Sequence, residues 1–294
     1  MKKTLILEGL GGLNRKERQS FLRFIHSPYF NRREDLVRLV DFLLGDEDIK
    51  MEELSKKDVF HALYPDSPYD DQKIRLLLSY LQKKLETFLT IEELKQSEGE
   101  KAWLMLSAMQ KRNLPRNYAR KLNYFEHRLG QQERRDGDYY YEKYRVELVD
   151  LDTAAISRGK KSINYKSLTD SLDSFYLSAK LSHACTALMY QSVVDQGYQF
   201  PLLDDVLKIA SQEKFSQVPA VSIYYLFIKV MNGWEEVDFA KLKNTLFEHR
   251  NVLSSQEFQN IYTMVLNFYV QRINRHELEF VPEALSFYKK GIDL

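Results

Sequence analysis

The sequence has little of the residues that cross-link or interrupt a polypeptide chain. Its 294 residues include 11 glycines, seven prolines and one cysteine, Cys185. A single cysteine excludes an intramolecular disulfide and a metal site built from several thiolates, and it suits a reducing compartment. The scarcity of glycine and proline, in a chain rich in tyrosine and phenylalanine, predicts long helices with thick interfaces between them.

An excess of charge of one sign is also missing. The chain has 43 lysines and arginines against 42 aspartates and glutamates, which gives a net charge of +1. This balance removes the simplest argument for a protein that binds nucleic acid or an anionic membrane over its whole surface. A local patch of one sign is still compatible with it.

Long hydrophobic segments are absent as well. No stretch approaches the roughly 18 uninterrupted apolar residues of a membrane-spanning helix. The short apolar run near the N-terminus is interrupted at Glu8, which is too early for a signal peptide. We therefore expect a cytoplasmic protein that has no membrane among its partners.

The local patterns of catalytic and metal sites do not occur. None of the six histidines lies three or four residues from another, and no His-Glu-x2-His occurs. His183 and Cys185 are two residues apart, so on a helix they point about 200° away from each other and form no dyad. We expect a buried structural cysteine, no cofactor, no metal and no enzymatic activity; an enzyme assembled from distant residues is the third alternative for function.

The glycine-rich stretch "EGLGG" near the N-terminus resembles a phosphate-binding loop only superficially. It lacks the Lys-Ser/Thr of the nucleoside-triphosphate loop and the third glycine of the dinucleotide-binding loop. We interpret it as a flexible tether that ends at Asn14.

What the sequence does contain is a series of helix signals. Four polar pairs, spaced three residues apart, have the pattern of helix N-caps, because each side chain can satisfy an amide that the helix end leaves unpaired. These pairs are Asn14 and Glu17, Asn31 and Glu34, Ser55 and Asp58, and Ser254 and Glu257. With the apolar periodicity they predict helices over 14–26, 33–44, 55–63, 70–96, 100–112, 116–135, 138–150, 167–197, 202–213, 219–231, 235–249, 254–275 and 282–291.

Two segments need separate treatment. The run "VSIYYLFIKV", residues 221–230, has high strand propensity, but no partner strand is apparent, so we predict a buried helix. Residues 150–167 are polar, end in a basic run and are predicted to form a long exposed loop.

We therefore predict an all-α protein with a small N-terminal helical domain, residues 1–98, followed by an antiparallel array of helical hairpins, residues 99–294. From about residue 100 onward, helix pairs recur every 30 to 45 residues, a spacing that resembles tetratricopeptide-like solenoids. The signature Trp-x2-Leu-Gly-x2-Tyr of that repeat is missing, so the resemblance is one of architecture. It implies a right-handed array that binds a partner in a groove.

A basic stretch in the second half of the chain is the first candidate site. Between Lys111 and Arg135 the chain has eight basic and two acidic residues, and the predicted loop of residues 150–167 adds four more basic residues, Arg158, Lys160, Lys161 and Lys166. Arg116, Arg120 and Lys121 fall on one helical turn, and Arg128 comes two turns after Arg120. One interpretation is a surface for phosphates or an acidic protein segment, and the other is an ordinary solvated helix face.

Asn267 and Asn274 are the second candidate site. They lie seven residues apart and share a predicted helix face with Met264 and Gln271. Such a pair of amides can bind the backbone of an extended peptide, although an ordinary solvent face or a hydrogen bond between helices also explains it.

The stretch "RRDGDYYYEKYR", residues 134–145, is interpreted as a corner between two helices. Arg134 and Arg135 would close the first helix, Gly137 would supply a left-handed turn residue, and Asp138 would cap the second helix. The three tyrosines that follow span about 200° of a helical turn, so they do not form one stacking platform.

The function that these features favour is a non-enzymatic interaction or scaffold protein, which presents a groove to a protein or peptide partner. The alternative is a regulatory protein that associates with nucleic acid through the basic stretch of residues 111–166. The sequence leaves the oligomeric state open.

Overall fold

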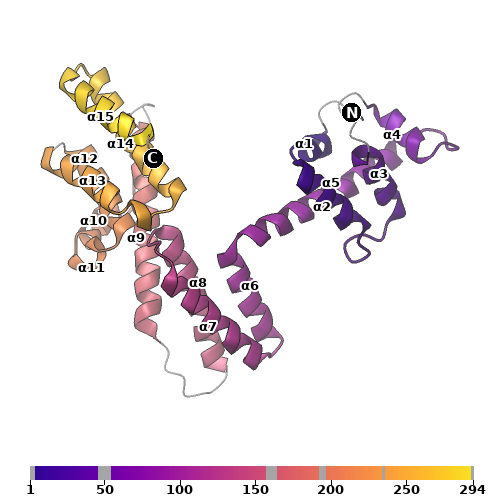
Figure 1. Ribbon diagram of the computed structural model, residues 1–294, viewed down its shortest axis with the longest axis horizontal. Helices are drawn as coiled ribbons and strands as arrows, with labels where there is room; N and C mark the ends of the chain where they lie inside the picture. Colours follow the sequence, from indigo (N-terminus) through magenta and orange to yellow (C-terminus); the bar gives the residue numbers. More distant parts are fainter. Residues whose placement is uncertain (1–3, 46–53, 157–163, 192–196, 234–235, 293–294) are drawn as a thin grey trace. The chain divides into compact units, whose positions relative to one another are not determined.

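The structure, a computed structural model, describes residues 4–45, 54–156, 164–191, 197–233 and 236–292. Across these residues it contains fifteen α-helices and two short 3-10 helices, and it has no strand (Figure 1). The predicted all-α class is therefore confirmed. Within the same residues no helix has both the length and the hydropathy that crossing a bilayer requires.

The chain divides into two compact units, residues 1–101 and 102–294. The boundary predicted from the sequence, between residues 98 and 99, lies three residues before this division. The described residues form one hydrophobic core in the first unit and two in the second.

The first unit consists of five helices packed around the long helix α5. These are α1 (Leu5–Gly11), α2 (Arg15–His26), α3 (Glu34–Leu44), α4 (Lys56–Leu63) and α5 (Asp71–Gln96). Helices α1 to α4 all contact α5, which buries Ile74, Leu81 and Phe88 among their apolar faces. One helix therefore forms the centre of the unit.

The N-terminal segment is a helix and not the flexible tether that its glycines suggest. Ile6 and Leu10 of α1 are buried against the core of the first unit, one turn apart on the same face. A Cβ atom on Gly9 would lie 2.5 Å from the Leu85 side chain of α5, so this glycine permits a close approach of the two helices.

Two of the predicted capping pairs of the first unit are present, and one is not. Asn14 with Glu17 and Ser55 with Asp58 form complete capping boxes. Asn31 instead is buried, and its side-chain amide donates to the carbonyls of Ile25 and Arg33, each at 3.0 Å. It therefore fixes the turn between α2 and α3, and α3 begins at Glu34 without its help.

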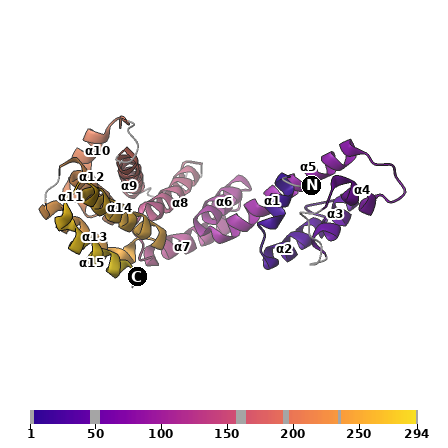
Figure 2. The ribbon, with the colours of Figure 1, turned by 90° about the horizontal axis from the view of Figure 1, so that it is seen from above.

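The second unit contains the remaining helices. They are α6 (Glu98–Lys111), α7 (Pro115–Gln131), α8 (Gly137–Ile156), α9 (Tyr165–Gln191), α10 (Leu203–Ala210), α11 (Glu213–Ser216), α12 (Pro219–Asn232), α13 (Glu236–Glu248), η1 (Arg250–Val252), α14 (Ser255–Asn274), η2 (Leu278–Phe280) and α15 (Val281–Ile292). One core joins α6, α7 and α8, and a larger one joins α9 to α15, which gather into one body (Figures 1 and 2).

The ambiguous run 221–230 is helical, as predicted. It belongs to α12, where nine residues are buried in contact with α9, α10, α11 and α13. Cys185 of α9 is completely buried beside it, with its sulfur 3.5 Å from the Tyr224 carbonyl oxygen. Neighbouring helices on several sides explain why the sequence of α12 is almost uniformly apolar.

The predicted loop over residues 150–167 is shorter than expected. Helix α8 continues to Ile156, and α9 begins at Tyr165. Arg158, Lys160 and Lys161 of the predicted basic run lie outside the described residues.

Candidate binding face on helix α14

The basic residues predicted as one stripe on α7 have different surroundings. Arg116 and Arg120 are exposed, and the Lys121 ammonium lies 5.3 Å from the centre of the Tyr124 ring. Arg128 is mostly buried and forms an ion pair with Glu142 of α8. Arg128 therefore ties α7 to α8, and the exposed stripe ends before it.

The corner at residues 134–139 differs in detail from the prediction. Helix α7 ends at Gln131, α8 begins at Gly137, and no glycine of the described residues has a positive φ. The capping residue is Asp136, because its Oδ1 accepts a hydrogen bond of 2.9 Å from the Tyr139 amide. Asp138, the predicted cap, is exposed.

Asp136 also fixes the start of α14. Its Oδ2 accepts a hydrogen bond of 3.0 Å from the Ser254 amide, and the Arg134 guanidinium donates to both carboxylate oxygens, at 3.0 Å each. Arg135 adds a backbone hydrogen bond of 2.7 Å to the Val252 carbonyl. These contacts hold the N-terminal end of α14 against the corner between α7 and α8.

Helix α14 begins where the sequence predicts, with Ser254 as its cap, but Glu257 does not return the bond, because the Ser254 amide donates to Asp136. Ser254 accepts a hydrogen bond of 3.1 Å from the Glu257 amide. The Glu257 carboxylate points inward and accepts from the Tyr224 hydroxyl at 3.1 Å. Burial, together with the nearby charge of Asp136, raises the pKa of Glu257 to about 7.

The outer face of α14 carries no charge. Glu257 and Arg272 are the only charged residues of the helix, and Arg272 is mostly buried, ion-paired with Glu277 at 2.7 Å and stacked on Phe280. The exposed residues, which we call the α14 face, are all uncharged. They are Ser255, Gln256, Gln259, Asn260, Thr263, Asn267, Val270 and Asn274. Successive positions at 100° per residue place all eight within an arc of about 140°.

Asn267 and Asn274 both lie on this face, about two helical turns apart, and their neighbours differ from those predicted. Met264 and Gln271 are half-buried at its edge, and the Gln271 amide is 3.9 Å from the Met189 sulfur of α9. The exposed neighbours of Asn267 are instead Thr263 and Val270.

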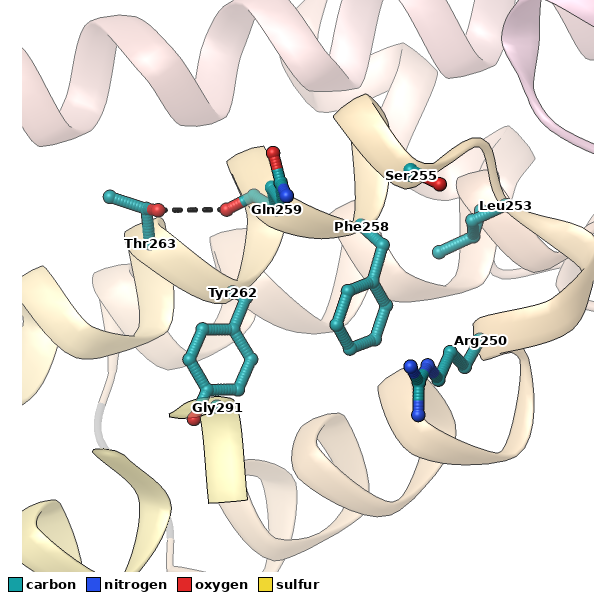
Figure 3. A pocket seen from close by; sticks show the side chains of 8 residues that line it. All are labelled: Arg250, Leu253, Ser255, Phe258, Gln259, Tyr262, Thr263 and Gly291. Atoms are coloured by element: carbon teal, nitrogen blue, oxygen red, sulfur yellow. Dashed lines mark hydrogen bonds between the residues drawn. The ribbon is translucent and has the colours of Figure 1, made fainter. Parts of the chain in front are cut away.

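A pocket of about 300 Å³ opens beside the first two turns of α14. The rings of Phe258 and Tyr262 lie next to each other in it, with Arg250 at one end and Gly291 at the other (Figure 3). Ser255, Gln259 and Thr263 belong both to its wall and to the α14 face. The pocket and the α14 face are therefore one continuous surface.

The aromatic floor of the pocket is held in place by α15. Tyr262 stacks on Phe287 with ring centres 4.4 Å apart, and its hydroxyl donates to the Phe287 carbonyl oxygen. A Cβ atom on Gly291 would lie within 2.7 Å of the Tyr262 ring, so only glycine permits this contact without a shift. These contacts fix the position of the Tyr262 ring against α15.

The residues that line this surface can contact a ligand through aromatic, polar and cationic groups. In the described part of the chain, no group of three or more His, Cys, Asp or Glu side chains could hold a metal ion. Burial raises the pKa of the Cys185 thiol well above its usual value, which keeps it out of the reactive thiolate form. The pocket offers an aromatic floor, one arginine, the amide of Gln259 and the hydroxyl groups of Ser255 and Thr263.

Comparisons with protein-family models, with curated proteins and with solved structures find no match for this chain. The arrangement of its own residues is therefore the basis for any functional assignment.

Proposed function

We propose that the second unit is a non-enzymatic interaction module that binds an extended segment of a partner protein along α14. The observation that carries the proposal is the uncharged, amide-rich α14 face that runs into the aromatic pocket. Asparagine and glutamine side chains both donate and accept hydrogen bonds, as does the backbone of an extended peptide. The pocket would take one apolar side chain of that peptide.

The lack of charge separates this face from an ordinary solvated helix surface. Charged residues make up 29% of the chain, yet all eight exposed positions of α14 are neutral. Removing a charged side chain from water is unfavourable unless it is paired, and the centres of protein interfaces are accordingly depleted in charge. A neutral face with an aromatic pocket beside it is thus suited to burial under a partner protein.

We also infer that the hairpins of the second unit form a solenoid-like array. Consecutive helices pack as the pairs α7–α8, α8–α9, α12–α13 and α14–α15, which supports this arrangement. The right-handed sense rests on the resemblance to tetratricopeptide-like repeats alone.

The proposal is tested with a displayed library of random peptides. The full chain selects peptides from the library, and isothermal titration then measures the affinity of synthetic copies. We expect enriched peptides with an apolar anchor residue, and a loss of affinity of about tenfold or more in the double variant Asn267→Asp, Asn274→Asp, because buried carboxylates would be left unpaired.

The control is Asn117→Asp, Asn123→Asp, which makes the same chemical change at two exposed positions of α7. It should bind the selected peptides as the unchanged chain does. If no peptide is enriched, or if both double variants lose affinity equally, the α14 face is not a peptide-binding surface.

A further inference from the structure

A second surface, on α7, is basic, whereas the α14 face is uncharged. Arg116, Arg120 and Tyr124 follow one another at intervals of four residues and are all exposed; Tyr124 is 53% exposed. Each interval advances about 6 Å along the helix and keeps the side chains on the same side. With Lys121, which lies between them, we call these residues the α7 face.

The two arginines of this face differ from the other arginines nearby. Arg128 pairs with Glu142, Arg134 with Asp136, and Arg135 donates to the Gln132 carbonyl. Within the described residues the side chains of Arg116 and Arg120 have no ion-pair or hydrogen-bond partner. Their guanidinium groups can therefore bind an anionic ligand without breaking an internal contact.

Tyr124 adds an aromatic surface to these cations. Its ring is supported on one side by the edge of Phe125, with ring centres 5.3 Å apart, and Phe125 is itself buried in the core of α6, α7 and α8. The Lys121 ammonium lies 5.3 Å from the centre of the Tyr124 ring. Much of the ring nevertheless faces solvent, at a position fixed by the helix.

We propose that the α7 face binds single-stranded nucleic acid, with Arg116, Arg120 and Lys121 on successive phosphates and Tyr124 stacked on a base. An extended strand carries regularly spaced phosphates and bases with open faces, and it thus uses both the cations and the ring. A duplex keeps its bases stacked internally, and an acidic peptide has no group that requires an aromatic platform. This inference does not depend on the peptide-binding function of α14.

The small number of cations sets the expected strength of binding. Three contacts to phosphates of a single strand give a slope of about −2 for the logarithm of affinity against the logarithm of salt concentration. The net charge of the whole chain is only +1, so the rest of the molecule contributes little attraction. Binding should therefore be clear at about 50 mM salt and much weaker at about 200 mM.

The test measures fluorescence anisotropy with labelled mixed-sequence strands of DNA and RNA, the corresponding duplex and a labelled polyglutamate peptide. We expect the full chain to prefer the single strands. The variant Arg116→Glu, Arg120→Glu should lose at least about tenfold in affinity, and Tyr124→Ala about tenfold, whereas Tyr124→Phe keeps the ring and the affinity.

The matched control is Lys208→Glu, Lys289→Glu, which changes the net charge equally at two exposed positions of α10 and α15. It should retain most of the affinity for single strands. Three results would overturn the proposal: no binding of single strands at low salt, an equal loss in the control, or tighter binding of the duplex or of polyglutamate. The last would identify duplex DNA or an acidic protein as the partner.

Discussion

Asp136 is a fully buried carboxylate whose hydrogen bonds join three separate segments of the second unit. It accepts from Arg134, from the first turn of α8 at Tyr139 and from the start of α14 at Ser254. A buried charge persists in a folded protein when its oxygens are paired in this way. The residue thus acts as a helix cap and as a long-range contact at the same time.

Replacing this carboxylate should destabilise the protein strongly. We expect Asp136→Ala to lower the free energy of unfolding by about 2–4 kcal/mol, because it removes a cap and leaves two amides and part of a guanidinium unpaired. Urea unfolding measures the change. Asp138→Ala, at a side chain that is 88% exposed, is the control and should cost less than about 0.5 kcal/mol. Equal effects would show that Asp136 does not hold the corner.

The buried carboxyl group of Glu257 should make the stability of the protein depend on pH. Its carboxyl has a folded-state pKa of about 7, above its ordinary value near 4.5. Protonation therefore favours the folded state, and this contribution is present below about pH 4.5 and is lost as the pH rises through 7. Glu257→Gln keeps an acceptor for Tyr224 but cannot ionise, so its stability should not fall as the pH rises. At pH 8 we expect its free energy of unfolding to exceed that of the unchanged chain by on the order of 1–3 kcal/mol.

Unfolding by urea at several pH values between 5 and 8 tests this expectation. The difference in stability between Glu257→Gln and the unchanged chain should grow with pH. Glu279→Gln, at an exposed position, serves as the control and should follow the unchanged chain. A constant difference across this range would mean that the Glu257 carboxylate stays ionised in the fold.

At the scale of the element, the sequence predicted the start of a helix well where the capping residues are neighbours in the chain. Ser254 and Glu257 marked the start of α14, and Asn14 with Glu17 marked that of α2, because a cap involves only neighbours in the chain. Helix α1 was missed, since its two glycines lower helix propensity and the contact with α5 compensates for them.

The packing of α1 leads to a paired mutational test. Leu10→Ala should lower the free energy of unfolding by about 2–4 kcal/mol, since Leu10 is completely buried in the core of the first unit. Leu5→Ala, in the same helix but 73% exposed, should have little effect. Thermal unfolding of the two variants distinguishes a docked helix from a tether, because a tether would make both substitutions neutral.

At the scale of the whole molecule, the sequence predicted the fold class and the identity of exposed polar residues, but not tertiary partners. Asn267 and Asn274 are exposed as expected, because a polar side chain on an amphipathic helix points away from the core. Arg128 looked equivalent to Arg120, and its burial became apparent only with Glu142 of the next helix in place.

The pocket was missed for a related reason. Phe258 and Tyr262 have the spacing of core residues, and both are indeed almost completely buried. Periodicity reports that a residue faces the protein interior, but not whether a neighbouring helix leaves a pocket above it. One signal was available in the sequence, because helix α14 has only two charged residues in twenty.

The hydrogen bond between Asp136 and Ser254 also has a consequence for the order of folding. The two residues are 118 positions apart, so this bond cannot form on a growing chain until α8 to α13 have been synthesised. The bond from Asp136 to Tyr139, three positions away, can form as soon as α8 appears. During synthesis from the N-terminus, the carboxylate would therefore begin as the solvated cap of a nascent helix. It becomes a desolvated link only when the arrival of α14 closes the loop, which makes that closure a late step.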